Sequence, residues 1–471
     1  MNKREHGVDR RTFLKTTVAG AAGLTLSGWG VPTLLKAANK PIKFGIMGPM
    51  GDAVGQNVLR PATLMVKKIN AQGGILGKKI EIVGPYDTNW EPSLGIRAFE
   101  RLKAAGVDVI LSGIIDDSES GLLSRIGGTS NNILYFSEFA STMAFMVKVR
   151  NNYKKLKNYF MFTPIDPGLY GCVDAPGQMF NKDFGWKNVY LMREDSVWTE
   201  GIGKMVLEET PKHGLNVVGE VVVPIDVKDM MPYYRKAQEA QADMIYTFIS
   251  AFGEVAASQK WENRVAIPMF GQNGVLNDYG FWQRSKGAWG PMASSSLWGS
   301  LEKHSKEWRD FMIEWFTTYK DDPRTPMWLG GCTWLSIKAY KDAVEGAGTT
   351  DTNAVIKALE KVYYPDAPVM GGFYGPDEGK WPHAWCIPID EQARFQKNPK
   401  RGPGLWKPSD MYPLTQWQPK EIAPASSFVL PGTPEDYGRL VTIWPPHLAG
   451  GKFHYPPYYT EKDIKKIEHK G

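Results

Sequence analysis

The chain has 471 residues, of which 42% are hydrophobic and 23% are charged, and its formal net charge is +6. This length predicts two or more domains, and the apolar fraction is sufficient to build hydrophobic cores. Residues 1–38 hold six basic and two acidic residues, so the rest of the chain carries a net charge of only +2. No lysine and arginine block indicates a nucleic-acid-binding or membrane-surface protein. A mean hydropathy of -0.33, without a long apolar run, favours a soluble protein.

The N-terminus has the features of a twin-arginine export signal. Arg10 and Arg11 precede Thr12-Phe13-Leu14-Lys15, a small-residue apolar run follows over residues 16–29, and Ala37-Ala38 offers a cleavage site. The run is too short for a spanning helix, which needs about 20 apolar residues. A chance arginine pair before a core helix is the alternative. The order of these regions predicts a signal peptide over residues 1–38, export to the periplasm and, because this segment contains no cysteine, no lipid anchor.

The chain shows no pattern typical of an enzyme or a metal site. Cys172, Cys332 and Cys386 lie far apart without metal-ligand spacing, and we expect no disulfide, although the spacing leaves one possible. The seven histidines are never paired at i,i+4. The nucleophile-elbow, zinc-protease, phosphate-loop and dinucleotide motifs are all missing. We therefore predict a protein that is not an enzyme, with no cofactor and no metal.

The segment from residue 42 to residue 92 predicts a strand, a glycine-rich break, a helix and a second strand. Ile42, Phe44 and Ile46 alternate as in a half-buried strand, and a helical pattern follows over residues 58–70. Residues 70–77 end that helix with glycines suited to positive φ. A strand over residues 79–83 then leads into Tyr86-Asp87-Thr88-Asn89-Trp90-Glu91-Pro92.

The same alternation continues along the chain. Further strands are expected at residues 107–111, 132–137, 188–192, 216–223, 244–249 and 265–270, and further helices at residues 91–104, 201–213, 230–241 and 253–263. Two successive series of this kind predict two parallel sheets with helices on both faces. Three more helices are expected at residues 303–320, 328–345 and 352–363, the first with an aromatic stripe assigned to packing. From residue 388 the chain is rich in proline and aromatic residues, which predicts extended chain over a surface.

The order of elements and the sequence "INAQGGILGKKIEI…YDTNWEP" closely resemble those of periplasmic binding proteins of the branched-chain amino-acid (Leu/Ile/Val) type. The resemblance covers residues 41–420. It implies an α/β type I periplasmic binding protein fold, in which two doubly wound parallel-sheet lobes are joined by a hinge that the chain crosses three times. It places lobe 1 at residues 41–162 plus 290–371 and lobe 2 at residues 163–289 plus 372–420, with a C-terminal extension at residues 421–471. The implied hinges are residues 162–164, 287–291 and 371–375.

In the first lobe, the resemblance implies ligand contacts in two loops. Asp116-Asp117-Ser118-Glu119-Ser120 stands where the family has a serine-rich loop that binds a ligand carboxylate. Ser118 and Ser120 fit that role, whereas Asp116, Asp117 and Glu119 would repel a carboxylate and are only possible contacts. In Ser137-Glu138-Phe139-Ala140-Ser141, Ala140 and Ser141 match the second loop, with Phe139 as a possible contact.

In the second lobe, the resemblance implies three more contacts. Trp198 stands where the family has an aromatic residue that closes over the ligand, and Phe252 lies near the next aromatic contact. Asn273 occupies the position where amino-acid binders place a glutamate against the ligand ammonium group. An asparagine cannot supply that charge-assisted bond but can face an amide, a urea-like or a hydroxyl group. Structural roles are the alternative: the acidic residues at 116–119 could form a solvated loop, Trp198 and Phe252 could pack between the lobes, and Asn273 could be needed for its backbone conformation.

These observations predict an extracytoplasmic solute-binding protein that captures a small polar solute and delivers it to the permease of an ABC importer. The solute class, an amino acid or a related amide, amine or acid, stays open. We expect a monomer that binds no nucleic acid. The alternatives are a ligand-sensing receptor for a signalling partner and an exported accessory subunit of an enzyme.

Overall fold

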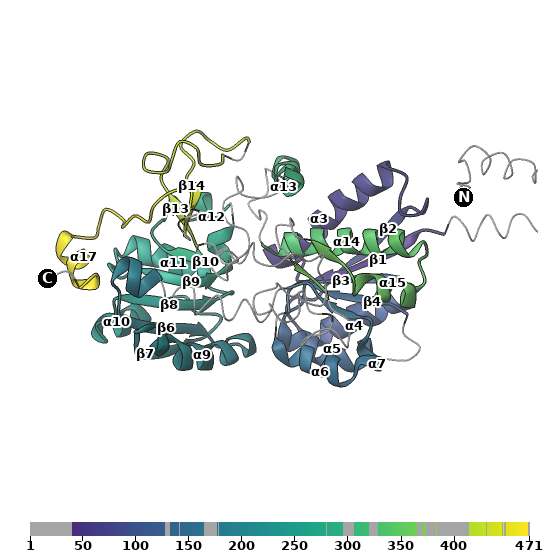
Figure 1. Cartoon of the computed structure of the whole chain (residues 1–471), viewed down its shortest axis with the longest axis horizontal. Helices are drawn as coiled ribbons and strands as arrows, with labels where there is room; N and C mark the ends of the chain where they lie inside the picture. Colours follow the sequence, from purple (N-terminus) through teal and green to yellow (C-terminus); the bar gives the residue numbers. More distant parts are fainter. Residues whose placement is uncertain are drawn as a thin grey trace, which may run out of the picture.

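The computed structural model describes residues 40–127, 132–140, 142–163, 177, 179–278, 280–294, 306–319, 328–364, 371–373, 383, 414–429, 431–444, 446 and 449–469. Within these ranges the chain forms two sheets, each covered by helices, that lie side by side (Figure 1). The predicted α/β class with parallel sheets is confirmed. The predicted export signal, Cys172, Cys386 and Ser141 lie outside the described residues.

The first sheet has five parallel strands in the order β2-β1-β3-β4-β5. Its strands are β1 (Ile42–Gly48), β2 (Ile80–Asp87), β3 (Val109–Ser112), β4 (Leu134–Ser137) and β5 (Tyr159–Met161). Its helices are α3 (Ala53–Ala71), α4 (Pro92–Ala104), α5 (Asp116–Ile126), α6 (Met143–Asn151) and α7 (Tyr153–Leu156). Burial on both faces, as in β3 and β4, explains why these strands read as continuous apolar runs.

The first strand-helix-strand unit follows from local side-chain chemistry. Helix α3 begins at Ala53, five residues before the predicted start, because the Asp52 side chain caps it by accepting from the backbone N–H of Val54. At its other end, Asn70 joins the helix to β2: its Nδ2 donates to the carbonyl oxygen of Ile80 at 2.8 Å, and its Oδ1 accepts from the Ile80 N–H at 2.7 Å. These bonds fix the start of β2 relative to the end of α3.

The second sheet has seven strands in the order β14-β13-β10-β9-β8-β6-β7. Five are parallel: β6 (Asn188–Glu194), β7 (Asn216–Val223), β8 (Met244–Ile249), β9 (Met269–Asn273) and β10 (Met292–Ser294). Its helical elements are η1 (Met179–Phe184), α9 (Val197–Glu209), η2 (Thr210–His213), α10 (Met231–Glu239), α11 (Gly253–Glu262), η3 (Gly274–Asn277) and α12 (Phe281–Arg284). Strand β9 begins four residues later than predicted, so Asn273 ends a strand instead of lying in a loop.

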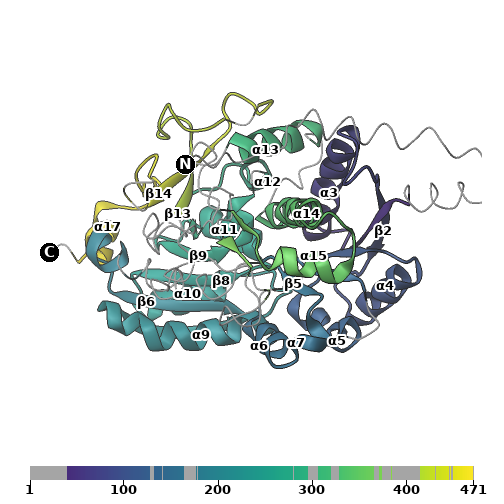
Figure 2. The same ribbon diagram turned by 45° about the vertical axis from the view of Figure 1, so that its right-hand side comes forward.

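The chain then returns to the first sheet. Helix α14 (Trp328–Ala347) packs against α3 and against α15 (Thr352–Leu359), and α13 (Lys306–Thr318) also contacts α3 (Figure 2). In the stripe of α13, Phe311, Trp315 and Phe316 are buried, with Trp315 fully covered, as expected for packing. A short hairpin of β11 (Tyr363–Tyr364) and β12 (Gly371–Gly372) follows. We use "first lobe" for the first sheet with these helices and "second lobe" for the second sheet with its own.

The second sheet also takes in part of the C-terminal region that was expected to be a separate extension. Strands β13 (Leu414–Gln418) and β14 (Arg439–Trp444) run antiparallel and extend the sheet beyond β10. Thus β10, which the expected boundary at residue 290 gives to the first lobe, and β14, expected in a separate extension, both lie in the second sheet. With β13 and β14 there, the chain passes between the two lobes three times.

The last described element, α17 (Glu461–Ile467), starts with a capping box made by Thr460 and Asp463. The chain before it packs on α11: the buried ammonium group of Lys260 donates to the Tyr459 hydroxyl at 3.1 Å and to the Val265 carbonyl at 2.7 Å. Aromatic side chains in this segment are therefore core residues of the second lobe. Among the described helices, none is long and apolar enough to cross a membrane.

Candidate functional site

The predicted site residues gather at the carboxyl ends of the two sheets. Strand order reverses direction between β1 and β3 in the first sheet and between β6 and β8 in the second, and ligands of open α/β sheets bind at such switch points. Helix α5 follows β3, helix α9 follows β6, and these two helices contact each other across the lobes. The loops that follow β3 and β6 are thus brought together, as the resemblance implied.

In the first lobe, the expected serine-rich loop is the start of a helix. Asp116 to Ser120 form the first residues of α5, so only some side chains face inward. Ser118 is buried and Ser120 is exposed, so the two predicted serines do not share one face. The Asp116 carboxylate accepts from the backbone N–H of Thr142 at 2.7 Å and joins α5 to the loop after β4. The side chain of Asp117 lies outside the described residues.

Glu119 points into the first sheet. Its carboxyl group contacts the hydroxyl groups of Tyr135, at 3.1 Å, and Tyr159, whose rings stack at 5.7 Å. Complete burial raises the pKa of Glu119 to about 8, although hydrogen bonds oppose that shift. Glu119 is therefore protonated at neutral pH and occupied with the core.

The loop after β4 is fixed by a second buried carboxyl group. Glu138 accepts hydrogen bonds from the hydroxyl groups of Thr333 and Ser336 on α14. Burial raises the pKa of Glu138 to about 8, so this group too is neutral at pH 7. Ala140, a predicted contact, is fully buried two residues later. The hydrogen bonds of Glu138 thus fix the loop that was expected to touch the ligand against α14.

In the second lobe, Trp198 lies in the first turn of α9 and is half-buried. Its indole N–H donates to the carboxylate of Glu194, the last residue of β6. Glu194 also accepts from the backbone N–H groups of Ser250, at 2.7 Å, and Ala251, at 2.9 Å, and from the Ser250 hydroxyl. This buried carboxylate, which sequence reasoning missed, sets the orientation of Trp198.

Phe252 and Asn273 meet at the start of α11. Phe252 is buried and precedes the first residue of the helix. Asn273 donates through Nδ2 to the carbonyl oxygen of Gly253 at 3.2 Å, whereas its buried Oδ1 has no hydrogen-bond partner among the described residues. A Cβ atom on Gly253 would lie 2.0 Å from that Oδ1, so only glycine fits there. Asn273 thus positions α11 and keeps one unused acceptor.

The structure also brings forward residues that the sequence did not single out. Trp90, in the loop after β2, packs edge-to-face on Phe139 with ring centroids 6.3 Å apart. Thr88, in the same loop, and Thr163, two residues after β5, carry buried hydroxyl groups without a partner among the described residues. A tryptophan in the polar turn after the strand predicted at residues 79–83 is the sequence signal that could have indicated this loop.

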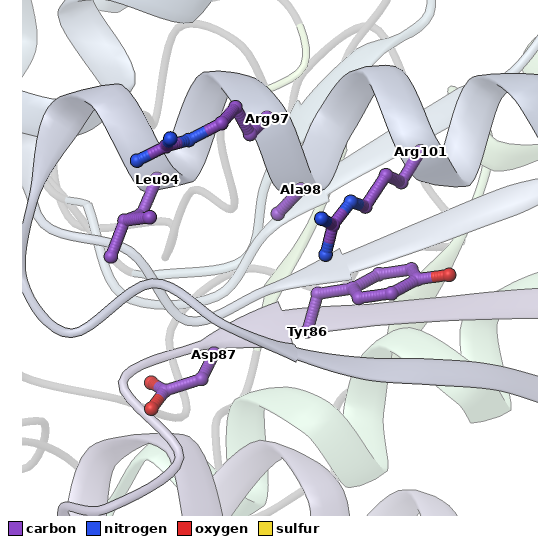
Figure 3. Close-up of a pocket in the computed structure, with 6 residues that line it drawn as sticks. All are labelled: Tyr86, Asp87, Leu94, Arg97, Ala98 and Arg101. Carbon is purple, nitrogen blue, oxygen red and sulfur yellow. The ribbon is translucent and has the colours of Figure 1, made fainter.

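A separate hollow of about 160 Å³ lies between β2 and α4. Arg97 and Arg101 line it from α4, and the Arg101 guanidinium lies over the ring of Tyr86 at 5.6 Å (Figure 3). None of the predicted site residues lines this hollow. No cluster of histidine, cysteine, aspartate and glutamate that could hold a metal ion occurs in the described part of the chain. Cys332, on α14, is a free and buried thiol.

Comparison with known families identifies the chain. The sequence profile described as "Periplasmic binding protein" matches residues 41–387. The chain belongs to the periplasmic binding protein family. This confirms the resemblance drawn from the sequence, and because its members are solute-binding proteins, it agrees with the prediction that the chain is not an enzyme. An uncharacterized protein of Methanocaldococcus jannaschii is 26% identical over 217 residues, which span 45% of this chain but only half of that relative.

Solved structures share the fold at low sequence identity. A periplasmic binding protein type 1 of Bordetella pertussis superposes with a TM-score of 0.64 at 17% identity, over 86% of this chain and all of that one. A branched-chain amino acid transporter substrate binding protein of Streptococcus pneumoniae, in complex with isoleucine, superposes with a TM-score of 0.61 at 16% identity. The match covers 80% of this chain and 96% of that one. An ABC transporter solute binding protein of R. palustris, in complex with 4-hydroxybenzoate, superposes with a TM-score of 0.62 at 12% identity. The match covers 86% of this chain and 96% of that one. These similarities show the type I fold.

Proposed function

We propose that this member of the family captures a small solute with a carboxylate or similarly polar end between its two lobes and delivers it to an ABC importer. The observation that supports this most directly is the contact between α5 and α9, each of which begins at a switch point of its own sheet. A solute held there touches both lobes at once. Binding can then favour the closed arrangement over the open one, which is what a clamshell receptor requires.

The helix starts suit a polar or anionic solute end. Among the described residues, neither α5 nor α9 has a side-chain hydrogen bond at its N-cap, so first-turn backbone N–H groups of both helices are candidates for contact with a solute. Within this proposal, Ala140 and Ser141, with either Ser118 or Ser120, contact the solute from the first lobe. Trp198, Phe252 and Asn273 do so from the second.

The chain crossings give the proposed movement its hinges. The proposed first lobe consists of residues 41–162 with 290–371, and the proposed second lobe of residues 163–289 with 372–420. Because β10 and β14 belong to the second sheet, we assign both strands to the second lobe. Residues 162–164 and 371–375, at the first and third crossings, would absorb the φ and ψ changes. The second crossing follows Ser294 and not the expected residues 287–291, because β10 lies in the second sheet. Residues 1–38 would direct twin-arginine export, and the mature protein would work as a periplasmic monomer docking on a membrane permease.

The identity of the solute is open to a direct test. Solved proteins of this fold hold isoleucine or 4-hydroxybenzoate, and both compounds carry a carboxylate. A thermal-shift screen would test amino acids, amides, amines and aromatic acids on the purified protein. A solute at one hundred times its dissociation constant should stabilise the fold by about 2.7 kcal/mol. A stabilising solute whose effect disappears in Trp198→Ala supports the proposal; a folded protein that responds to no class contradicts it.

A further inference from the structure

Trp90 and Phe139 come from strands that are not neighbours. Trp90 follows β2 and Phe139 follows β4, and strands β1 and β3 lie between them in the sheet. With about 4.8 Å between adjacent strands, β2 and β4 are roughly 14 Å apart. The two rings nevertheless meet with centroids 6.3 Å apart and planes inclined at 65°. The pair therefore reaches over the carboxyl ends of β1 and β3, which form the switch point of the first lobe.

The loop that carries Trp90 is held in an unfavourable conformation. Asn89 and Trp90 both have positive φ values, 42° and 62°, which non-glycine residues rarely adopt. The Asp87 carboxylate supports this geometry by accepting from the backbone N–H groups of Asn89, at 3.0 Å, and Met50, at 2.9 Å. Thr88 adds a bond from its N–H to the Gly48 carbonyl oxygen at 3.0 Å. Strain that surrounding bonds maintain is typical of ligand-binding segments.

Two further properties of this loop point to a ligand. The Trp90 side chain is still 38% exposed, although large aromatic residues in folded proteins are usually covered. The Thr88 hydroxyl, two residues earlier, is buried without a hydrogen-bond partner among the described residues. An exposed ring beside an unused polar group is what a binding site with an apolar wall and a few polar contacts presents.

Four of the carboxyl groups near this site are already bonded or turned away, whereas Glu91, the residue after Trp90, is exposed and accepts from the Asn89 side-chain amide at 3.3 Å. Asp87 and Glu194 are occupied by the hydrogen bonds described above, and Glu138 is buried and bonded to α14. Asp195 is exposed, but its backbone N–H bonds to Val223, which places it toward the β7 edge. An α-ammonium group would gain no charged partner from Asp87, Glu138, Glu194 or Asp195.

We propose that Trp90 and Phe139 form an aromatic wall of the solute site, and that the solute carries a flat aromatic group. This inference rests on the proposed solute-binding function and narrows its solute class to aromatic acids. A flat ring can stack on the indole or approach it edge-on, whereas a branched aliphatic chain makes a less complementary contact.

The test is isothermal titration calorimetry with 4-hydroxybenzoate and L-isoleucine as probes. Wild-type protein would be compared with Trp90→Phe, Trp90→Ala and Phe139→Ala, and Leu207→Ala would serve as a control at an exposed position of α9. We expect 4-hydroxybenzoate to bind and isoleucine not to. Trp90→Ala and Phe139→Ala should weaken binding about tenfold or more, as loss of an aromatic contact implies, while Trp90→Phe and the control stay within about threefold.

Circular dichroism and the unfolding midpoint of each variant would show whether it is folded, and Phe139→Ala avoids placing alanine at a positive φ. Binding of isoleucine without 4-hydroxybenzoate, or an unchanged affinity in both folded alanine variants, would overturn the inference and leave the solute-binding function intact. If no solute of the wider screen binds, the proposed function itself fails together with the inference.

Discussion

Glu194 and Ser250 connect the carboxyl ends of β6 and β8. The Glu194 carboxylate accepts from the backbone N–H of Ser250 at 2.7 Å and also from its hydroxyl group. The same carboxylate holds the indole of Trp198. One buried side chain therefore fixes the second-lobe switch point and the aromatic residue proposed to close over the solute.

The first prediction concerns this carboxylate. Glu194→Gln keeps the size of the side chain but replaces an oxygen that accepts hydrogen bonds with an amide that donates them. The N–H groups of Ser250 and Ala251 share one carboxylate oxygen, which the glutamine oxygen can replace. The glutamine NH2 group then faces the indole N–H of Trp198, so we expect a loss of about 1–3 kcal/mol in the free energy of unfolding, measured by urea denaturation. The matched control is Glu208→Gln on the same side of the lobe, where the exposed ion pair with Lys204 should contribute less than about 1 kcal/mol. Equal effects of the two substitutions would refute the role of Glu194.

The second prediction concerns the buried Lys260. Burial lowers its pKa from 10.5 to about 7, so between these values the unfolded state binds more protons than the folded state. The contribution of this lysine to stability therefore rises as the pH increases from 7 to 10, by at most about 1.4 kcal/mol per pH unit. Urea unfolding at pH 7 and pH 9 should show that the difference between wild type and Lys260→Met shifts in favour of wild type at the higher pH. A pH-independent difference would show that the ammonium group is not desolvated.

The third prediction concerns the buried Glu138, whose contribution to stability changes with pH in the opposite direction to that of Lys260. Burial raises the pKa of Glu138 from 4.5 to about 8, so between these values the folded state holds a proton that the unfolded state has lost. The contribution of Glu138 to stability is complete below pH 4.5 and decreases as the pH rises to 8, by up to about 1.4 kcal/mol per unit. Glu138→Gln, which cannot titrate, should therefore gain stability relative to wild type between pH 5 and pH 8. Parallel pH profiles of the two proteins would contradict this assignment.

The fourth prediction concerns the contact between β9 and α11. A methyl group on Gly253 would collide with the Asn273 side chain, so Gly253→Ala should force Asn273 away and destabilise the second lobe by about 1–3 kcal/mol. Gly201→Ala is the control, because a Cβ atom there meets no heavy atom within 4 Å. Removing the obstacle in Gly253→Ala/Asn273→Ala should recover part of the loss in thermal unfolding. No recovery in the double variant would mean that the strain lies elsewhere.

The sequence predicted the local elements well where periodicity was strong. Strands β7 and β8 have the predicted bounds, and α4 and α14 differ from prediction by no more than two residues at either end. These segments carry their pattern in neighbouring residues. The start of α5 was mistaken for a loop because aspartate and serine are poor helix formers in general and yet suit a first turn.

The pairing of β14 with β13 could not be predicted, because it depends on contacts between segments about twenty residues apart in a proline-rich region. Nor could the contact of Trp90 with Phe139 or the three bonds of Glu194 with Ser250 and Ala251, which join loops distant in sequence. The resemblance indicated which loops matter. Which side chains turn toward the crevice depends on helix phase and burial, as the contrast between Ser118 and Ser120 shows.

The central claim is that a solute closes the two lobes on each other. Small-angle X-ray scattering of the protein, without solute and saturated with the solute found in the thermal-shift screen, measures this directly. We expect the radius of gyration to fall on saturation, because a bridging solute favours the closed arrangement. An unchanged radius of gyration at proven saturation would contradict the account.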